Sequence, residues 1–160
     1  DALAGFEKSG HFFLAGKYGR GYDDACISSA MFVAVMSNST LSVSKLIREQ
    51  IKGHQTPTMA PSVKNDTEKY AIMNRIIEKF SKESYFAGKH IVDKITVNGI
   101  RLMLEDGCWV LLRASSNQPV LTVVIESFTS KKDVSMLFQA VLEVLKKEGI
   151  TRKNFDQLIE

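Results

Sequence analysis

Two dipeptides, Asn98-Gly99 and Asp106-Gly107, constrain the fold of this chain more than any other feature. Each is a strong signal for a two-residue β-hairpin turn, because that turn type needs positive φ at both positions. The apolar residues around the two dipeptides alternate with a period of two, which is typical of strands. We therefore expect three antiparallel strands near residues 91–97, 100–105 and 108–113.

A polar segment interrupts the apolar pattern after the third expected strand. It reads Arg113-Ala114-Ser115-Ser116-Asn117-Gln118-Pro119 and leads into a fourth apolar run, residues 120–126. Small polar residues beside a fixed cation can direct backbone N–H groups and hydroxyls toward one anion, and a guanidinium suits the geometry of phosphate. Taken alone, the segment is more simply explained as a polar turn whose arginine is solvated.

Helices are expected on both sides of the four strands. A helix beginning at Asp66 or Thr67 places its apolar residues on one face, and Ser130 with Asp133 forms a capping-box-like start for a last helix that ends at Gly149. The predicted fold class for residues 66–160 is α+β: a four-stranded antiparallel sheet with flanking helices packed on one face.

Residues 1–52 follow a different pattern. Residues 1–10 show no strand or helix periodicity, residues 11–15 form a short apolar run, and Asp23 or Asp24 can cap a helix over residues 25–36. That helix is apolar on almost every side and must be buried from several directions, which the rest of this segment cannot provide. We therefore predict the tail of an α/β domain, so that the chain is a fragment. Prolines mark residues 53–65 as a linker to the next domain.

Composition limits the function classes. With 160 residues, 44% apolar and 24% charged, the chain reads as a soluble globular protein. A net charge of +3 is too small to indicate nucleic-acid binding. Cys26 and Cys108 lie in apolar runs, where buried reduced thiols are expected. No apolar run approaches the roughly 20 residues of a membrane span. We expect a cytoplasmic protein with no nucleic-acid or membrane partner.

A second polar cluster, Glu7-Lys8-Ser9-Gly10-His11, precedes the first apolar run. The Glu7 carboxylate can accept hydrogen bonds from two vicinal hydroxyls, Ser9 can donate or accept beside it, and His11 can add a donor. This set suits the hydroxyl edge of a sugar. A solvated loop is the plain alternative, and a metal site has too few ligands in Glu and His alone.

Together the two polar motifs resemble those of the α-D-phosphohexomutases. The resemblance rests on Glu7-x-Ser9-Gly10-His11, then Gly21-Tyr22-Asp23-Asp24, and finally Arg113 to Pro119. It is closest to the bacterial phosphomannomutase/phosphoglucomutase type. It covers essentially the whole chain, but only the end of the third and all of the fourth of the family's four domains.

The resemblance implies a specific activity for the full-length enzyme. Family members are isomerases that move phosphate between carbons 1 and 6 of glucose or mannose phosphates, through a hexose 1,6-bisphosphate, with an active-site phosphoserine and magnesium. By resemblance Glu7, Ser9 and His11 would bind sugar hydroxyls. The non-transferred phosphate would be held by Arg113, Ser115, Ser116 and Asn117.

The phosphoserine and magnesium loops of the family have no match in this chain. The resemblance therefore implies no catalytic residue and no metal ligand here, and it implies that the remaining domains of the same polypeptide are partners. We expect the chain to be inactive alone. A stand-alone phosphosugar-binding module is the alternative, and a nucleic-acid or protein-docking domain is a further one.

Three positions depart from the family pattern. Asn117 stands where Thr is usual, Gln118 where Glu is common, and Val124 where some relatives carry a second phosphate-binding Arg. The first two can still form hydrogen bonds, whereas Val124 leaves Arg113 to match more of the phosphate charge. The preferred hexose is left open.

Overall fold

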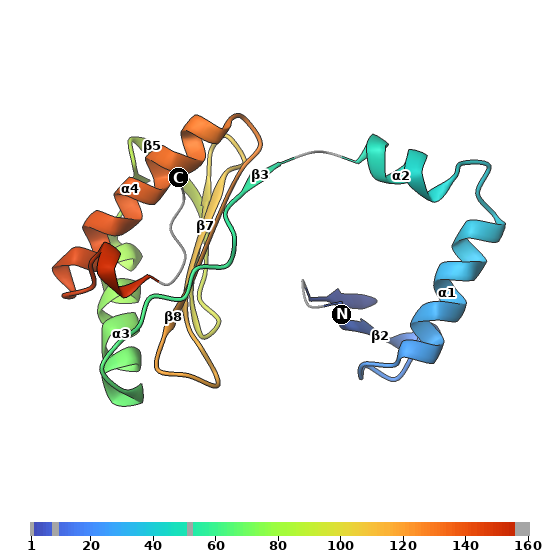
Figure 1. Ribbon diagram of the computed structural model, residues 1–160, viewed down its shortest axis with the longest axis horizontal. Coiled ribbons are helices and arrows are strands. Elements are labelled where there is room, and N and C mark those ends of the chain that lie inside the picture. Colours follow the sequence, from blue (N-terminus) through green and yellow to red (C-terminus); the bar gives the residue numbers. More distant parts are fainter. Residues whose placement is uncertain (1, 8–9, 51–52, 156–160) are drawn as a thin grey trace. The chain divides into compact units, whose positions relative to one another are not determined.

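The computed structural model describes residues 2–7, 10–50 and 53–155. The chain divides into two compact units, Asp1–Ile51 and Lys52–Glu160 (Figure 1). Within the described residues, no helix is both long enough and apolar enough to cross a membrane.

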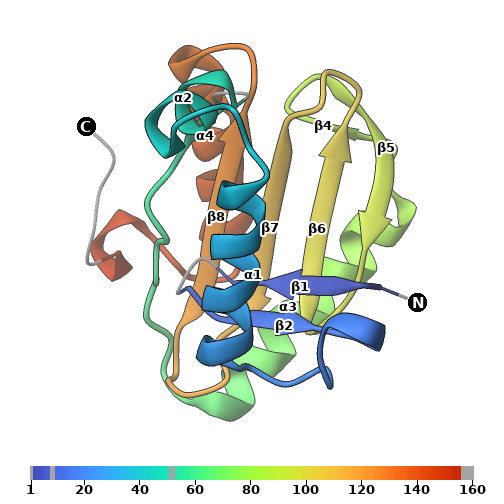
Figure 2. The same ribbon diagram turned by 90° about the vertical axis from the view of Figure 1, so that its right-hand side faces the viewer.

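The larger unit is built on one antiparallel sheet with the strand order β3-β8-β7-β6-β5-β4. Figure 2 shows its four long strands side by side. The α+β class is confirmed, but the prediction of a four-stranded sheet is wrong, because two short strands extend it to six. The strands are β3 His54–Gln55, β4 Tyr85–Phe86, β5 Lys89–Ile95, β6 Gly99–Leu104, β7 Trp109–Ala114 and β8 Leu121–Ser127.

The two additional strands lie at the edges of the sheet and span only two residues each. Such a length carries no periodicity that a sequence pattern can detect. β4 turns into β5 through Ala87 and Gly88, whose φ angles of 50° and 79° are both positive. β3 lies in the segment that we expected to be a linker, and this segment runs beside β8, with further bridges at Met59 and Ser62.

The two predicted hairpin turns form, with a different backbone from the one expected. Only Asn98 in the first turn and Gly107 in the second have positive φ, at 53° and 80°. Gly99 is required for another reason: a Cβ at this position would lie 2.3 Å from the Leu112 carbonyl oxygen and 2.5 Å from the Cα of Arg113. The absence of a side chain therefore lets β6 approach β7 at the residue that carries the predicted phosphate contact.

Two long helices, α3 (Asp66–Lys82) and α4 (Lys131–Lys147), cover one face of this sheet (Figure 1). Their first turns are capped by Asn65 and Ser130, whose side chains accept hydrogen bonds from backbone N–H groups. The core lies between the helices and this face. Its main members are Ile72, Ile76, Phe80, Ile100, Leu102, Leu112, Leu121, Val123, Ile125, Leu137, Phe138 and Val141.

The smaller unit begins with a hairpin of β1 (Ala4–Phe6) and β2 (Phe12–Leu14). The expectation that residues 1–10 contain no strand is wrong, because β1 is three residues long and becomes regular only by pairing with β2. A 3₁₀ turn at Gly16–Tyr18 follows, and the larger unit has a similar turn at Arg152–Asn154.

Helices α1 (Ala25–Ser37) and α2 (Val43–Glu49) complete the smaller unit. Asp24 caps α1 by accepting a hydrogen bond from the Ile27 N–H group. None of the α1 residues is buried, although its sequence is apolar all round. Accordingly Cys26 is exposed, contrary to expectation, whereas Cys108 is buried as expected.

Candidate functional site

The predicted phosphate contact Arg113 lies near the end of β7, opposite Gly99 on β6 and Thr122 on β8. Its neighbours Leu112 and Ala114 are buried in the core, so Arg113 lies on the sheet face that α3 and α4 leave uncovered. The side chain is half-buried. Among the described residues it has no hydrogen-bond or ion-pair partner, which leaves its guanidinium available to a ligand.

The other predicted phosphate contacts follow directly in the loop between β7 and β8. Ser115 is half-buried, whereas Ser116 and Asn117 are exposed. The Ser115 N–H group donates to the Val120 carbonyl at 3.1 Å and closes the loop. Inside it, the Asn117 N–H group donates to the Ser115 hydroxyl at 3.4 Å. The four predicted residues are therefore brought together at one end of the sheet.

Lys69 on α3 lies beneath this loop and was missed by sequence reasoning. Its side chain is 1% exposed. Its Nζ donates to the carbonyl oxygens of Ser115 at 2.7 Å and Gln118 at 2.9 Å, and to the carboxylate of Asp66 at 2.6 Å. A signal was present, because Lys69 occupies the apolar stripe of α3 together with Ile72 and Met73. A charged residue in such a stripe needs partners from another element.

The same sheet face carries a second guanidinium. Arg101 on β6 pairs with Leu111 on β7, which pairs with Val124 on β8, so the three form one row across the sheet. The Arg101 guanidinium lies over the Trp109 ring, 4.4 Å from its centroid. Its Nε is buried and has no hydrogen-bond partner within the described part of the chain. Val124 itself is 7% exposed.

The predicted sugar contacts lie in the loop that joins β1 to β2 in the smaller unit. The Glu7 N–H group donates to the His11 carbonyl at 3.0 Å, and the Gly10 N–H group donates to the Glu7 carbonyl at 2.9 Å. These bonds hold Glu7 and His11 at the two ends of a tight loop, with both residues exposed. Ser9 lies outside the described residues.

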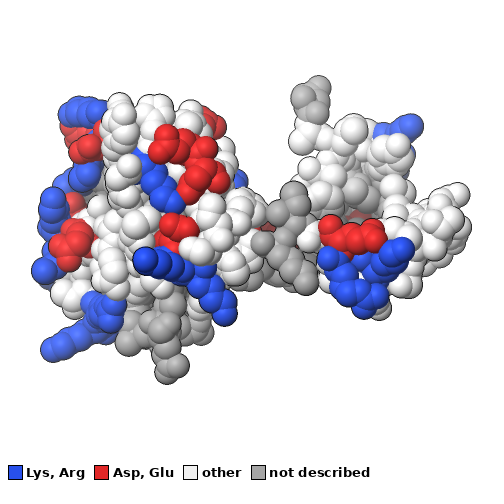
Figure 3. Space-filling model, turned by 90° about the horizontal axis from the view of Figure 1, so that it is seen from above, with Lys and Arg blue, Asp and Glu red and all other residues white. Residues whose placement is uncertain are grey.

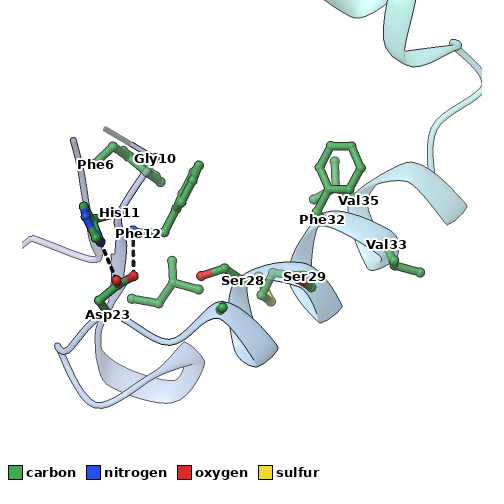
Figure 4. Close-up of a pocket in the computed structure, with 13 residues that line it drawn as sticks. Phe6, Gly10, His11, Phe12, Asp23, Ser28, Ser29, Phe32, Val33 and Val35 are labelled. Atoms are coloured by element: carbon green, nitrogen blue, oxygen red, sulfur yellow. Dashed lines mark hydrogen bonds and ion pairs between the residues drawn. The ribbon is translucent and has the colours of Figure 1, made fainter. Parts of the chain in front are cut away.

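The His11 ring is held by Asp23, from the segment before α1 (Figure 4). The His11 Nδ1 lies 2.5 Å from Asp23 Oδ2, and Asp23 Oδ1 accepts a hydrogen bond from the Phe12 N–H group at 3.2 Å. The hydrogen bond and charge of Asp23 raise the pKa of His11, and Glu7 contributes in the same direction. The hydrogen bonds from His11 and from the Phe12 N–H group lower the pKa of Asp23. The geometry directs His11 Nε2 away from Asp23, where it can donate to a ligand.

A hollow of about 800 Å³ lies beside this loop in the smaller unit. Figure 4 shows His11 and Asp23 at one end and Phe32 and Val33 of α1 toward the other. The wall is mainly apolar, and Phe32 and Val33 are more than half exposed. Apart from His11 and Asp23 at one end, this wall offers few hydrogen-bonding groups.

The two groups of predicted residues thus belong to different units. In the described parts, no three His, Cys, Asp or Glu side chains come together in a way that could hold a metal ion. Lysines and arginines lie among acidic side chains on the face of the larger unit that Figure 3 shows, so this face carries no continuous basic patch.

Comparison with known proteins gives a consistent result. Residues 1–54 match the family model described as phosphoglucomutase/phosphomannomutase, alpha/beta/alpha domain III. A phosphoglucomutase/phosphomannomutase of Thermococcus kodakarensis is 30% identical over 131 residues, covering 81% of this chain and 25% of that protein. A phosphomannomutase/phosphoglucomutase of Pseudomonas syringae pv. tomato is 29% identical over 128 residues, covering 80% of this chain and 25% of that protein.

Other relatives carry other names. A probable phosphoglucosamine mutase of Methanothermobacter thermautotrophicus is 28% identical over 108 residues, covering 66% of this chain and 22% of that protein. The chain therefore spans about a quarter of the length of these relatives. A solved structure of a phosphoglucomutase/phosphomannomutase family protein from Burkholderia thailandensis superposes with a TM-score of 0.69 over 92% of this chain and 29% of that one, at 22% identity. That likeness supports the fold.

Proposed function

The chain belongs to the phosphohexomutase family and corresponds to a C-terminal part of these enzymes, and we propose that it provides the ligand-holding contacts of such a mutase. The reaction is the interconversion of a hexose 1-phosphate and a hexose 6-phosphate. In this proposal the loop after β7 holds the phosphate that is not being transferred, and the loop between β1 and β2 holds the sugar ring.

The observation that carries the proposal is the state of Arg113. A half-buried guanidinium without a partner in the described chain lies beside a loop of small hydroxyl residues, Ser115 and Ser116. Charge-assisted hydrogen bonds from a guanidinium to phosphate are short and strong, and the planar donor group can bind two oxygens at once. Hydroxyls and backbone N–H groups of the loop can complete the anion site.

The loop of the smaller unit offers complementary chemistry. The Glu7 carboxylate is a hydrogen-bond acceptor, as sugar hydroxyls require, and His11 supplies a donor whose ring is fixed by Asp23. A mutase must bind its sugar in two opposite orientations. Contacts to hydroxyls in the middle of the sugar can be made in both of them. Phosphoryl transfer depends mostly on positioning and charge stabilisation, which are the tasks assigned to these two loops.

Magnesium and a phosphoserine would supply charge neutralisation and the transferred phosphate in the full-length enzyme. By resemblance, the loops that would supply them have no match in this chain, and the described part brings no three metal-ligating side chains together. We therefore assign the chain binding and orientation, and no covalent step. The relatives carry the names of mutases for different hexoses, so the proposal specifies a hexose phosphate and leaves the preferred hexose open.

Titration of the isotope-labelled chain, followed by NMR, tests the proposal. Glucose 6-phosphate or mannose 6-phosphate should shift the backbone signals of residues 113–120 and of the loop around Glu7 and His11. Inorganic phosphate should shift only the first group, and the bare sugar only the second. If neither loop responds to millimolar hexose phosphate, the proposal is wrong. A response at the loops without turnover by a full-length protein would identify a phosphosugar-binding module.

A further inference from the structure

We infer that Lys69 is a positioning residue for the phosphate site: its buried ammonium group sets the conformation of the loop after β7 from below. The inference rests on the proposed function, since it concerns the same loop. It assigns a role to a residue of α3 that does not reach the exposed side of the loop.

The first support is the complete use of the ammonium donors. A lysine ammonium has three N–H donors, and the three partners of Lys69 are the carbonyl oxygens of Ser115 and Gln118 and the carboxylate of Asp66. The three distances lie between 2.6 and 2.9 Å. Two of the three bonds therefore go to the backbone of the candidate phosphate loop, on either side of Ser116 and Asn117.

The second support is burial. Lys69 is 1% exposed, and lysine is almost never fully buried unless its charge is paired. Carbonyl oxygens of a surface loop are ordinarily satisfied by water, so loop geometry alone does not require a lysine here. A buried ammonium bound to two such carbonyls fixes their directions more firmly than water would.

The third support is the direction of the loop N–H groups. In a trans peptide unit the carbonyl oxygen and the following N–H group point to opposite sides. Because the Ser115 carbonyl points to Lys69, the Ser116 N–H group points away from it, toward the exposed side of the loop. Lys69 thus presents a backbone donor on the side where a phosphate would bind, next to Arg113.

A comparison of two lysine variants tests this role. Lys69→Met keeps the length and apolar stem but removes the ammonium group. Lys82→Met, on the same helix, removes an exposed lysine paired with Glu78 and serves as the control. The affinity for inorganic phosphate should fall about 10- to 100-fold in Lys69→Met, which is the loss expected when one hydrogen bond to a charged group is no longer made. The affinity for bare glucose should not change, and Lys82→Met should match the wild type for both.

A measurement on the wild-type chain covers the case in which Lys69→Met does not fold. The NMR signal of the buried Lys69 ammonium group reports its hydrogen exchange directly. If the lysine and the ligand hold the same loop, saturating phosphate should slow this exchange. A merely structural lysine would exchange at the same rate with and without phosphate.

The outcomes separate this inference from the proposed function. The role of Lys69 would be overturned if a folded Lys69→Met variant bound phosphate with wild-type affinity. It would also be overturned if phosphate did not change the hydrogen-exchange rate of the Lys69 ammonium group. If Arg113→Ala then still weakened phosphate binding, the proposed function would stand. If the wild-type chain bound no phosphate, both would fall together.

Discussion

At the scale of single residues, the candidate site depends on how charged groups are paired. Arg113 has no partner in the described chain, whereas Lys69 has all three of its donors occupied. His11 lies between these cases, because Asp23 holds one side of its ring and leaves the other side open. A charged side chain without a partner can bind a ligand. A charged side chain whose donors are all used can instead hold a neighbouring segment in place.

The pair of His11 and Asp23 predicts a pH dependence. Asp23 raises the pKa of His11, so in the folded chain the His11 ring is still largely protonated at pH 6.5. Its contribution to stability and to sugar binding should be complete below pH 6.5 and should be lost as the pH rises through the raised pKa. Asp23→Asn should move the NMR titration of His11 to lower pH.

Asp24→Asn is the matched control for this titration. It removes the neighbouring charge, which caps α1 and does not contact the ring, so the His11 titration should stay close to that of the wild type. Asn is also a good N-cap residue, so the helix should be retained. Identical titrations of His11 in the wild type and in Asp23→Asn would refute the assigned cause.

At the scale of elements, the hairpin of β6 and β7 determines where Arg113 lies. Gly99→Ala would place a Cβ within 2.5 Å of the Arg113 Cα, so the strands must separate. Overpacking of this kind costs about 1–3 kcal/mol of unfolding free energy. We expect chemical denaturation to show such a loss, together with weaker phosphate binding.

Gly107→Ala provides the comparison for the hairpin prediction. At position 107 the strain comes from the positive φ of 80°, and the nearest atom to an added Cβ is a Phe128 carbon at 3.7 Å. This variant should lose stability without losing phosphate affinity. Equal phosphate affinities in the two variants would show that Gly99 does not position Arg113.

Sequence patterns predicted the elements whose signals are local. The apolar alternation and the Gly-containing dipeptides located β5 to β8, and cap residues located the helices. β3 and β4 were not predicted. A strand of two residues is defined by its pairing with the neighbouring strand and not by its own composition. The Ala87-Gly88 turn was equally hard to predict, since alanine rarely adopts a φ of 50°.

The candidate site was predictable to a similar extent. Sequence motifs named the residues that would contact a ligand; Arg113 lies near the end of β7, and Ser115, Ser116 and Asn117 lie in the loop that follows it. Their supporting residues, Lys69 and Asp23, were not assigned these roles. Support of this kind depends on contacts between distant parts of the chain, such as the 46-residue separation of Lys69 and Ser115. The periodicity of a sequence does not predict contacts between residues that are far apart in the chain.

At the scale of the whole molecule, the two units differ in how well they are packed. The larger unit has a continuous core between its sheet and two helices, whereas α1 in the smaller unit contains no buried residue. We expect residues 52–160, expressed alone, to melt cooperatively at nearly the same temperature as the corresponding transition of the 160-residue chain. Calorimetry checks this. A truncated chain without a cooperative transition would show that the larger unit needs the smaller one.

The central claim is that Arg113 binds the phosphate of a sugar phosphate. Isothermal titration of the 160-residue chain with glucose 6-phosphate and with glucose tests it most directly. A hydrogen bond to a charged group contributes about 1.5–3 kcal/mol. Arg113→Ala should therefore weaken glucose 6-phosphate binding about 10- to 150-fold and leave glucose binding unchanged. Arg113→Lys should recover part of the loss, because it keeps the charge without the planar donor group.

Arg75→Ala is the control for this titration, because it makes the same charge change at an arginine of α3 that pairs with Glu148. Its binding of both ligands should equal that of the wild type. The account predicts a loss that is specific to Arg113 and to the phosphorylated ligand. An equal loss for glucose and glucose 6-phosphate, or no loss at all in Arg113→Ala, would contradict it.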